Sequence, residues 1–283
     1  MSTYHELVTA ANHALKDYNI GDNTAKYFMY ELLNERGIDM YLHYEEEADA
    51  EVADVYEKGI ERLKQDEPLA YILGYQWFYG RKFYVHEDVF IPRYETEELC
   101  GEILANVDEY FPEGEVTVAD IACGSGAIDV TLALEEERLR VYATDLSEIA
   151  VEAAANNAKK NGADVTFFTG DLLEPIRKNG LKLDILVCNP PYIVDDIALD
   201  PSVVNYEPHM ALFGGADGLD FYRRLLAEAK DVIKEKAMIA FEIGYDQKDA
   251  LLQLAKQYFP NDRAEVVKDL NGKDRMFFLY HNL

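Results

Sequence analysis

An asparagine, two prolines and a tyrosine follow an apolar run in the second half of the chain, and this combination can bind a planar nitrogen group. The run at 184–188 (DILVC) is typical of a buried strand, and Asn189, Pro190, Pro191 and Tyr192 come directly after it. The side-chain oxygen of Asn189 and the carbonyl oxygen of Pro190 can together accept both N–H bonds of an amide or ring-conjugated amino group. Such a nitrogen is a poor nucleophile because its lone pair is delocalised, so a site that fixes and orients it supplies much of the rate.

The prolines and the aromatic ring of this motif each have a role in that hypothesis. Pro190 and Pro191 stiffen the backbone, and Tyr192 can pack against the planar group. A proline-stiffened turn without chemistry is the structural alternative. We predict that Asn189, Pro190 and Tyr192 are catalytic and that all four residues bind the substrate. The chemistry demands no general base, and the sequence identifies none.

A loop of small residues follows an earlier apolar run, at 116–122. Residues 120–128 read D-I-A-C-G-S-G-A-I, and such a loop between a strand and a helix lets a ligand approach the backbone and the helix N-terminus. Tight turns also use glycines for packing alone. The loop therefore predicts a ligand site only together with other features.

Acidic residues stand at the ends of the next two strands. Asp145 can accept hydrogen bonds from ribose hydroxyls, Asp171 can accept an adenine amino group, and Leu172 can cover the ring. Each acid could instead be an ordinary helix N-cap. With Asp120, they make three acids at three successive strand ends, which predicts one nucleoside-sized pocket.

The loop favours S-adenosylmethionine over a dinucleotide. A dinucleotide fingerprint reads G-x-G-x-x-G, but Gly124 and Gly126 are followed by Asp129 at the third glycine position. The carboxylate of Asp120 would repel a pyrophosphate, whereas it suits the cationic amino group of a methionine moiety. We therefore expect S-adenosylmethionine as the cofactor, with S-adenosylhomocysteine as its product.

These motifs together resemble a known family. Asn189 to Tyr192 with the 120–126 loop resembles the class I methyltransferases that act on planar nitrogens. Five further segments are similar to the PrmC (HemK) family over nearly the whole chain: 67–74 (EPLAYILG), 90–97 (FIPRYETE), 206–208 (YEP), 211–219 (ALFGGADGL) and 268–275 (KDLNGKDR). Members of that family methylate the side-chain nitrogen (N5) of the glutamine in the Gly-Gly-Gln motif of peptide-chain release factors.

The resemblance also implies roles for individual residues. Phe90 would line the slot for the glutamine. The implied cofactor contacts beyond Asp120 are Ala122, Cys123, Gly124, Ser125, Gly126, Asp145, Asp171, Leu172 and Asn189. Two positions depart from the family pattern, which has glycine at Ala122 and proline at Tyr94.

Alternating strands and helices must position these loops. Strand patterns at 116–122, 140–145, 164–168, 183–188, 236–243, 264–268 and 275–280 alternate with helical patterns such as 147–161 and 218–234. The expected fold class is α/β, a Rossmann-like class I methyltransferase sheet. It should be mostly parallel, with the last strand antiparallel because the final connection is too short for a crossover.

Three domains are expected along the chain. Residues 1–67 carry only helical patterns and are predicted to form a small substrate-recognition domain. Residues 68–90 are rich in β-forming aromatic residues and predict a β-hairpin linker. Residues 91–283 form the expected S-adenosylmethionine-dependent methyltransferase domain.

Composition limits the partners. Lys and Arg total 27 against 54 Asp and Glu, a formal net charge of −27. This excess disfavours nucleic acids and anionic membranes, which attract basic proteins. Three cysteines without paired spacing and six scattered histidines predict neither disulfides nor a metal site. The N-terminus lacks the apolar region of a signal peptide. We expect a cytoplasmic monomer.

Several functions remain open on the sequence alone. The leading one is glutamine methylation of release factors, which the context of Thr96 between two glutamates favours over the rival glutamine of a large-subunit ribosomal protein. An adenine-N6 methyltransferase of DNA or RNA would use the same chemistry at Asn189, but the chain lacks a basic recognition region. A non-catalytic protein that retains the cofactor pocket is a further alternative.

Overall fold

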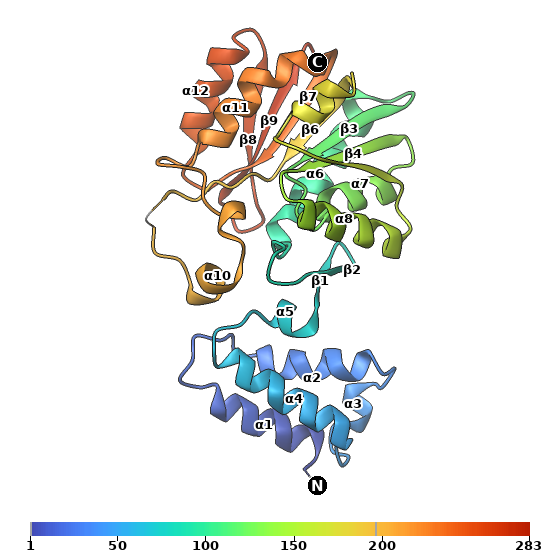
Figure 1. Cartoon of the computed structure of the whole chain (residues 1–283), viewed down its shortest axis with the longest axis vertical. Coiled ribbons are helices and arrows are strands. Elements are labelled where there is room, and N and C mark those ends of the chain that lie inside the picture. The colour runs from blue at the N-terminus through green and yellow to red at the C-terminus, as the bar shows by residue number, and fades with distance from the viewer. Residues whose placement is uncertain (1, 196) are drawn as a thin grey trace. The chain divides into compact units, whose positions relative to one another are not determined.

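The computed structural model describes residues 2–195 and 197–283. The chain divides into two compact units, which are drawn in Figure 1. The smaller unit comprises Met1–Gly74 and Leu199–Tyr206, and the larger unit comprises Tyr75–Ala198 and Glu207–Leu283.

The smaller unit is helical, as the sequence predicts. Thr3 begins the first helix with a capping box to Glu6. Gly59 permits close helix packing, because a Cβ there would lie 2.2 Å from Phe28. The helices are α1 (Tyr4–Ala14), α2 (Thr24–Asn34), α3 (Met40–His43), α4 (Ala50–Leu63), α5 (Leu69–Leu73) and α10 (Pro201–Tyr206).

The larger unit contains a short hairpin and a seven-stranded sheet. The hairpin is β1 (Tyr75–Phe78) and β2 (Arg81–Tyr84). The sheet strands are β3 (Val116–Ile121), β4 (Leu139–Asp145), β5 (Val165–Thr169), β6 (Leu183–Cys188), β7 (Ile233–Glu242), β8 (Arg263–Lys268) and β9 (Asp274–His281). Their order is β5-β4-β3-β6-β7-β9-β8, and only the pairs that involve β9 are antiparallel. The predicted fold class is confirmed.

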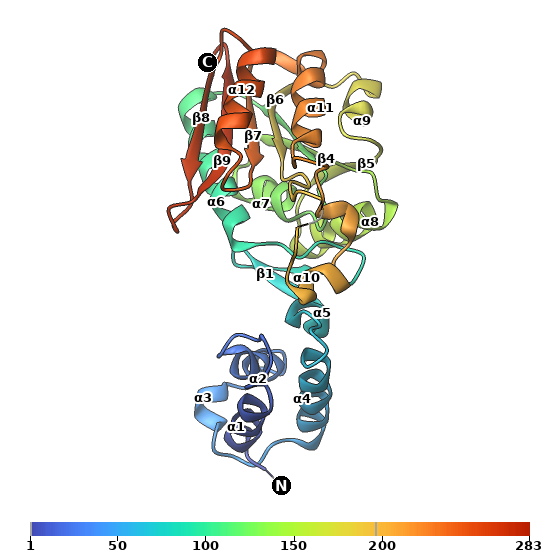
Figure 2. The same cartoon turned by 90° about the vertical axis from the view of Figure 1, so that its left-hand side faces the viewer.

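Helices cover both faces of this sheet (Figures 1 and 2). One apolar cluster joins the sheet to α6 (Tyr94–Tyr110), α7 (Ala127–Glu135) and α8 (Glu148–Asn161). The other joins it to α9 (Glu174–Lys178), α11 (Asp220–Glu228) and α12 (Lys248–Tyr258). Strands such as β6, which is buried along its whole length, are sandwiched between these layers.

Two segments differ from the sequence prediction. The hairpin begins at Tyr75, because residues 69–73 form α5, which ends at Gly74 in the left-handed conformation. The helical pattern at 218–234 ends at Glu228, and a short 3-10 turn then leads to β7, which begins at Ile233. Ile233 pairs with Leu183 of β6, so sheet pairing overrides the helical pattern there. In the described part of the chain no helix is long and apolar enough to cross a membrane.

Candidate active site

A cavity of about 380 Å³ opens at the carboxyl ends of the parallel strands in the larger unit. It brings together most of the residues that the sequence singled out. Those on its wall are Phe90, Ala122, Cys123, Gly124, Ser125, Asp145, Asp171, Leu172, Asn189, Pro190, Pro191 and Tyr192. Asp120 and Gly126 are not on the wall.

The loop after β3 has an unusual backbone. Ala122, Gly124 and Gly126 all have positive φ, at 60°, 55° and 80°. Glycine is required at Gly126 for a second reason, since a Cβ there would lie 3.0 Å from the Cβ of Ala154. An L-residue in the left-handed region costs roughly 1–2 kcal/mol, so Ala122 is strained where the family pattern has glycine.

Asp145 at the end of β4 is tied to this loop. Its Oδ2 accepts the Gly124 N–H at 2.9 Å, and its Oδ1 accepts the Ser147 N–H at 2.9 Å. Burial raises the pKa of Asp145, while these backbone donors oppose the rise. Each carboxylate oxygen keeps a further lone pair, so the side chain can still accept two hydroxyl groups.

The residues after β5 lie farther along the wall. Asp171 is half-exposed and forms an ion pair with Arg224. Leu172 is buried with φ of 45°, and its carbonyl accepts the Thr144 hydroxyl at 3.1 Å. Thr144 of β4 thus holds the strained backbone of Leu172 in place.

Asp120 differs most from its predicted role as a direct ligand. Its side chain is fully buried and lies beside that of Asp129, in the first turn of α7, where the two carboxyl groups can share a proton in a hydrogen bond. Burial raises the pKa of Asp120 to about 8, and burial together with Asp120 raises the pKa of Asp129. Backbone N–H groups of Asp129 and Val130 oppose this rise, but burial outweighs them. The buried pair therefore favours retaining a proton near neutral pH.

The 189–192 segment is held by a second loop, residues 212–219. Ile193 donates its N–H to Leu212 at 3.0 Å and accepts from Gly214 at 2.8 Å. A Cβ at Gly214 would lie 2.5 Å from the Pro191 oxygen, and one at Gly218 would lie 2.3 Å from the Tyr192 oxygen. Both glycines are therefore needed for this close approach.

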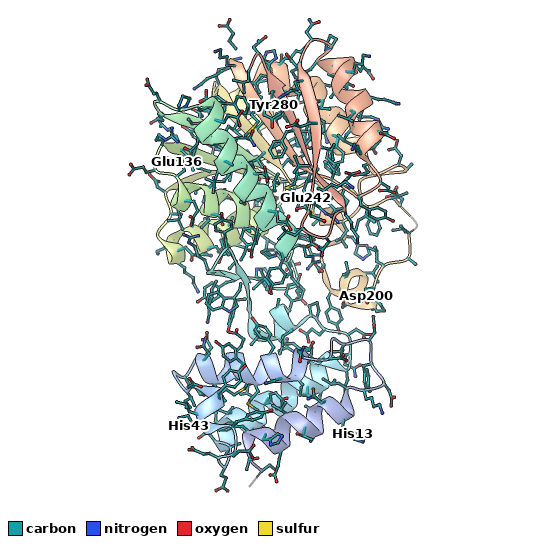
Figure 3. All side chains as sticks on the ribbon, turned by 180° about the vertical axis from the view of Figure 1, so that it is seen from behind. His13, His43, Glu136, Asp200, Glu242 and Tyr280 are labelled. Carbon is teal, nitrogen blue, oxygen red and sulfur yellow. The ribbon has the colours of Figure 1, made fainter. Side chains whose placement is uncertain are left out.

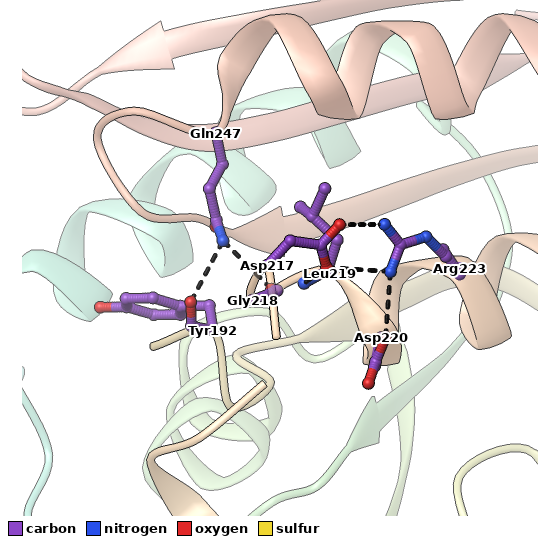
Figure 4. A network of polar contacts seen from close by, with 7 residues as sticks. All are labelled: Tyr192, Asp217, Gly218, Leu219, Asp220, Arg223 and Gln247. Carbon is purple, nitrogen blue, oxygen red and sulfur yellow. Dashed lines mark hydrogen bonds and ion pairs between the residues drawn. The ribbon is translucent and has the colours of Figure 1, made fainter. Parts of the chain in front are cut away.

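Gln247 joins these two loops to the end of β7. Its Nε2 donates to the carbonyls of Tyr192 and Gly218, both at 3.1 Å (Figure 4). Its Oε1 accepts the Gly244 N–H at 2.8 Å. Nearby, Arg223 forms ion pairs with Asp217 and Asp220, as Figure 4 also shows.

Phe90 is fixed on the wall by a charged pair. The Arg93 guanidinium lies 4.7 Å from the centre of the Phe90 ring, and Arg93 forms an ion pair with buried Glu207. A Cβ at Gly124 would lie 3.9 Å from the Cβ of Phe90. Phe90 therefore lies beside Gly124, on the wall of the same cavity as the 189–192 segment.

Sequence reasoning missed three supporting residues, Asn157, Glu242 and Gln247, and it used Thr96 only as part of a family motif. Asn157 donates to the carbonyls of Ser125 and Tyr84 at 2.9 and 3.0 Å, which ties the loop to the hairpin. Thr96, Glu242 and Gln247 contact the 189–192 segment. Only Glu242 had a usable signal, an acid at the end of an apolar strand. None of the described residues forms a cluster of three or more side chains that could hold a metal.

The sheet order and this cavity define a class I methyltransferase. A Pyrococcus furiosus methyltransferase superimposes with a TM-score of 0.50 at 19% identity, covering 71% of this chain and 89% of that one. The delta-N METTL16 methyltransferase domain gives 0.51 at 16% identity, covering 69% and 86%. Both likenesses establish the fold.

Sequence comparison establishes the family. The PrmC N-terminal domain matches residues 6–74, and the methyltransferase small domain matches residues 103–205. The release factor glutamine methyltransferase of Bacillus cereus is 42% identical over 97% of this chain and 98% of its own length. That of Staphylococcus aureus is 34% identical over 98% of each. The chain belongs to the release factor glutamine methyltransferase family.

Proposed function

We propose that the protein transfers a methyl group from S-adenosylmethionine to the side-chain amide nitrogen (N5) of the glutamine in the Gly-Gly-Gln motif of peptide-chain release factors. The observation that carries this proposal is that Asn189 to Tyr192 share one cavity wall with Asp145 and the 122–125 loop. A nucleoside site and an amide-binding site thus adjoin. Family membership supports the release factor as the methyl acceptor.

The residues on the wall fit S-adenosylmethionine. Asp145 keeps lone pairs for the ribose hydroxyls, Asp171 can accept the adenine amino group, and Leu172 offers an apolar surface to the ring. The backbone of 122–126 would lie along the methionine moiety. Asp120 would act through the loop that it supports, because it does not reach the wall. When bound, the cofactor supplies a methyl group activated by its sulfonium.

The chain's own residues bind and orient the acceptor. Asn189 Oδ1 and the Pro190 carbonyl accept the two amide N–H bonds, which fixes the nitrogen and supports positive charge as it develops. Tyr192 and Phe90 pack against the planar amide. Orientation of this kind contributes on the order of 7–11 kcal/mol to the barrier. The amide nitrogen loses its proton after the transfer, so no general base is required.

The remaining features concern recognition. The helical unit would recognise the release factor, and the net charge of −27 would attract a locally basic partner and disfavour nucleic acid. We propose that the protein acts as a monomer in the cytoplasm. A large-subunit ribosomal protein and adenine-N6 are the competing acceptors, and neither has an observation in its favour.

One experiment separates these acceptors. The protein is given labelled S-adenosylmethionine with a release factor, a ribosomal-protein mixture and adenine-containing DNA, and mass mapping locates the methyl group. We expect label on the release-factor glutamine, and label on DNA or a ribosomal protein alone refutes the proposal. Asn189→Ala should lower kcat by about 10²-fold or more, whereas the exposed Asn179→Ala should match wild type. Equal rates for Asn189→Ala and wild type would contradict the mechanism.

A further inference from the structure

A buried carboxylate lies behind two of the proposed catalytic side chains. Glu242, the last residue of β7, is 2% exposed and is labelled in Figure 3. β6 and β7 run parallel with Cys188 opposite Phe241, so Asn189 and Glu242 follow at the same level on neighbouring strands. Glu242 is therefore placed by the sheet register to act on the residues that follow β6.

Hydrogen bonds connect Glu242 to Asn189 through Thr96 in the first turn of α6. The Thr96 hydroxyl donates to Glu242 Oε2 at 2.6 Å, and Asn189 Nδ2 donates to Thr96 Oγ1 at 3.2 Å. Thr96 is itself 4% exposed. Glu242 and Thr96 are buried and Asn189 is partly buried at the cavity wall, so the Thr96–Glu242 hydrogen bond is shielded from bulk water and orients both groups strongly.

The donor and acceptor roles in these hydrogen bonds follow from the chemistry of the Glu242 carboxylate. An ionised carboxylate can only accept, so Thr96 must direct its single hydroxyl hydrogen to Glu242. The Thr96 oxygen can then only accept from Asn189, which must present its NH₂ group to it. The amide oxygen of Asn189 therefore lies on the opposite edge, as an acceptor for a substrate N–H.

The other oxygen of the same carboxylate holds the tyrosine. The Tyr192 hydroxyl donates to Glu242 Oε1 at 3.3 Å. Burial raises the pKa of Tyr192, so the phenol remains a donor. Burial also raises the pKa of Glu242, but its two hydroxyl donors and the positive charge of Arg275 favour the ionised form. Arg275 is itself paired with Asp269 at 3.3 Å.

We propose that Thr96 and Glu242 are positioning residues for methyl transfer: they fix the Asn189 amide with its oxygen toward the substrate nitrogen and hold the Tyr192 ring. This inference rests on the proposed function of the same site. A flipped Asn189 would present N–H groups to an N–H donor. Such an arrangement would bind the glutamine amide poorly and leave its lone pair misdirected.

Thr96 offers a test with matched variants. Thr96→Val keeps the shape and removes the hydroxyl, whereas Thr96→Ser keeps the hydroxyl. We expect Thr96→Val to lower kcat about 10- to 100-fold, by analogy with partners that orient metal ligands, whose loss costs about that much. Thr96→Ser should stay within about threefold of wild type, and the affinity for S-adenosylmethionine, measured by calorimetry, should change less than about threefold in both.

Thr131 supplies the control for the substitution itself. It is a fully buried threonine in α7, and its hydroxyl has no hydrogen-bond partner within the described residues. Thr131→Val should therefore leave kcat unchanged. Side-chain amide signals of Asn189 in ¹⁵N-edited spectra give a second readout, with slow hydrogen exchange in wild type and Thr96→Ser and faster exchange in Thr96→Val.

The outcomes separate positioning from general stability. A wild-type kcat for Thr96→Val, or an equal loss in Thr96→Ser and Thr96→Val, overturns the inference. A loss of activity that is explained entirely by weaker S-adenosylmethionine binding also overturns the inference. The comparison uses whichever planar-nitrogen acceptor the wild-type enzyme methylates. A wild-type enzyme that leaves release factors unmodified would refute the proposed substrate, while the ratio between the Thr96 variants still tests the positioning role.

Discussion

The paired carboxyl groups of Asp120 and Asp129 should make the stability of the larger unit depend on pH, and Asp129→Asn should reduce that dependence. Both side chains are fully buried and lie against each other, and burial raises the pKa of each carboxyl above its ordinary value. In the variant, an amide N–H can donate to the ionised Asp120 carboxylate. The pair then no longer requires a proton at this position.

The sign and size follow from proton linkage. Burial raises the pKa of Asp120 to about 8, whereas an aspartate in an unfolded chain titrates near pH 3.9. Between about pH 4 and pH 8 the native state holds a proton that the unfolded state has released, so stability falls as pH rises. One such proton contributes a slope of about 1.4 kcal/mol per pH unit. Asp129→Asn should remove about that much slope.

The chain provides a convenient probe for this measurement. Its single tryptophan, Trp77, lies in β1 of the larger unit, so fluorescence during urea unfolding reports on that unit. Unfolding free energies of both proteins are compared at several values between about pH 5.5 and pH 7.5. Other titrating groups are common to both and cancel in the difference. A difference that is constant across this range would refute the shared proton.

Three further predictions concern the loop, the cofactor and the partner. Ala122→Gly relieves a φ of 60° and should stabilise the larger unit by about 0.5–1 kcal/mol after the unfolded-state entropy of glycine is subtracted, which the urea midpoint measures; a lower midpoint contradicts the strain. Asp145→Ala removes an acceptor on the cavity wall and should weaken S-adenosylmethionine binding at least about 10-fold by calorimetry, so an unchanged Kd would exclude its role. Raising salt from about 50 to about 300 mM should lower kcat/KM for the release factor but not the cofactor Kd. A salt-independent kcat/KM would show that the charge of −27 does not recruit the partner.

The sheet could be predicted because each strand has a signature that depends on its own residues. A strand such as β6 lies between two helical layers, so it is apolar along its length and stands out in the sequence. The loops on the cavity wall could be predicted because chemistry imposes local motifs on them, as at Asn189 and Gly124. Both kinds of signal are short-range.

The residues that hold these loops in place could not be predicted, because they lie far in the sequence from the residues they contact. Glu242 becomes informative only when strand order places β7 beside β6, since it lies 2% exposed behind residues that precede it by some fifty positions. Gln247 is equally inconspicuous until the 212–219 loop approaches the Tyr192 carbonyl.

Asp120 illustrates the opposite failure. The sequence predicted Asp120 as a direct cofactor contact, but an acid at a strand end can face either the ligand or the protein interior, and Asp120 faces the interior. Helix α7 decides how deeply Asp120 is buried, because its first turn places Asp129 against Asp120 and buries both side chains. A buried carboxyl pair that shares a proton can stabilise the strained loop without touching the cofactor. Variants of Asp129 should therefore alter cofactor affinity only through the shape of the 122–126 loop, and through Asp145, which binds that loop at Gly124.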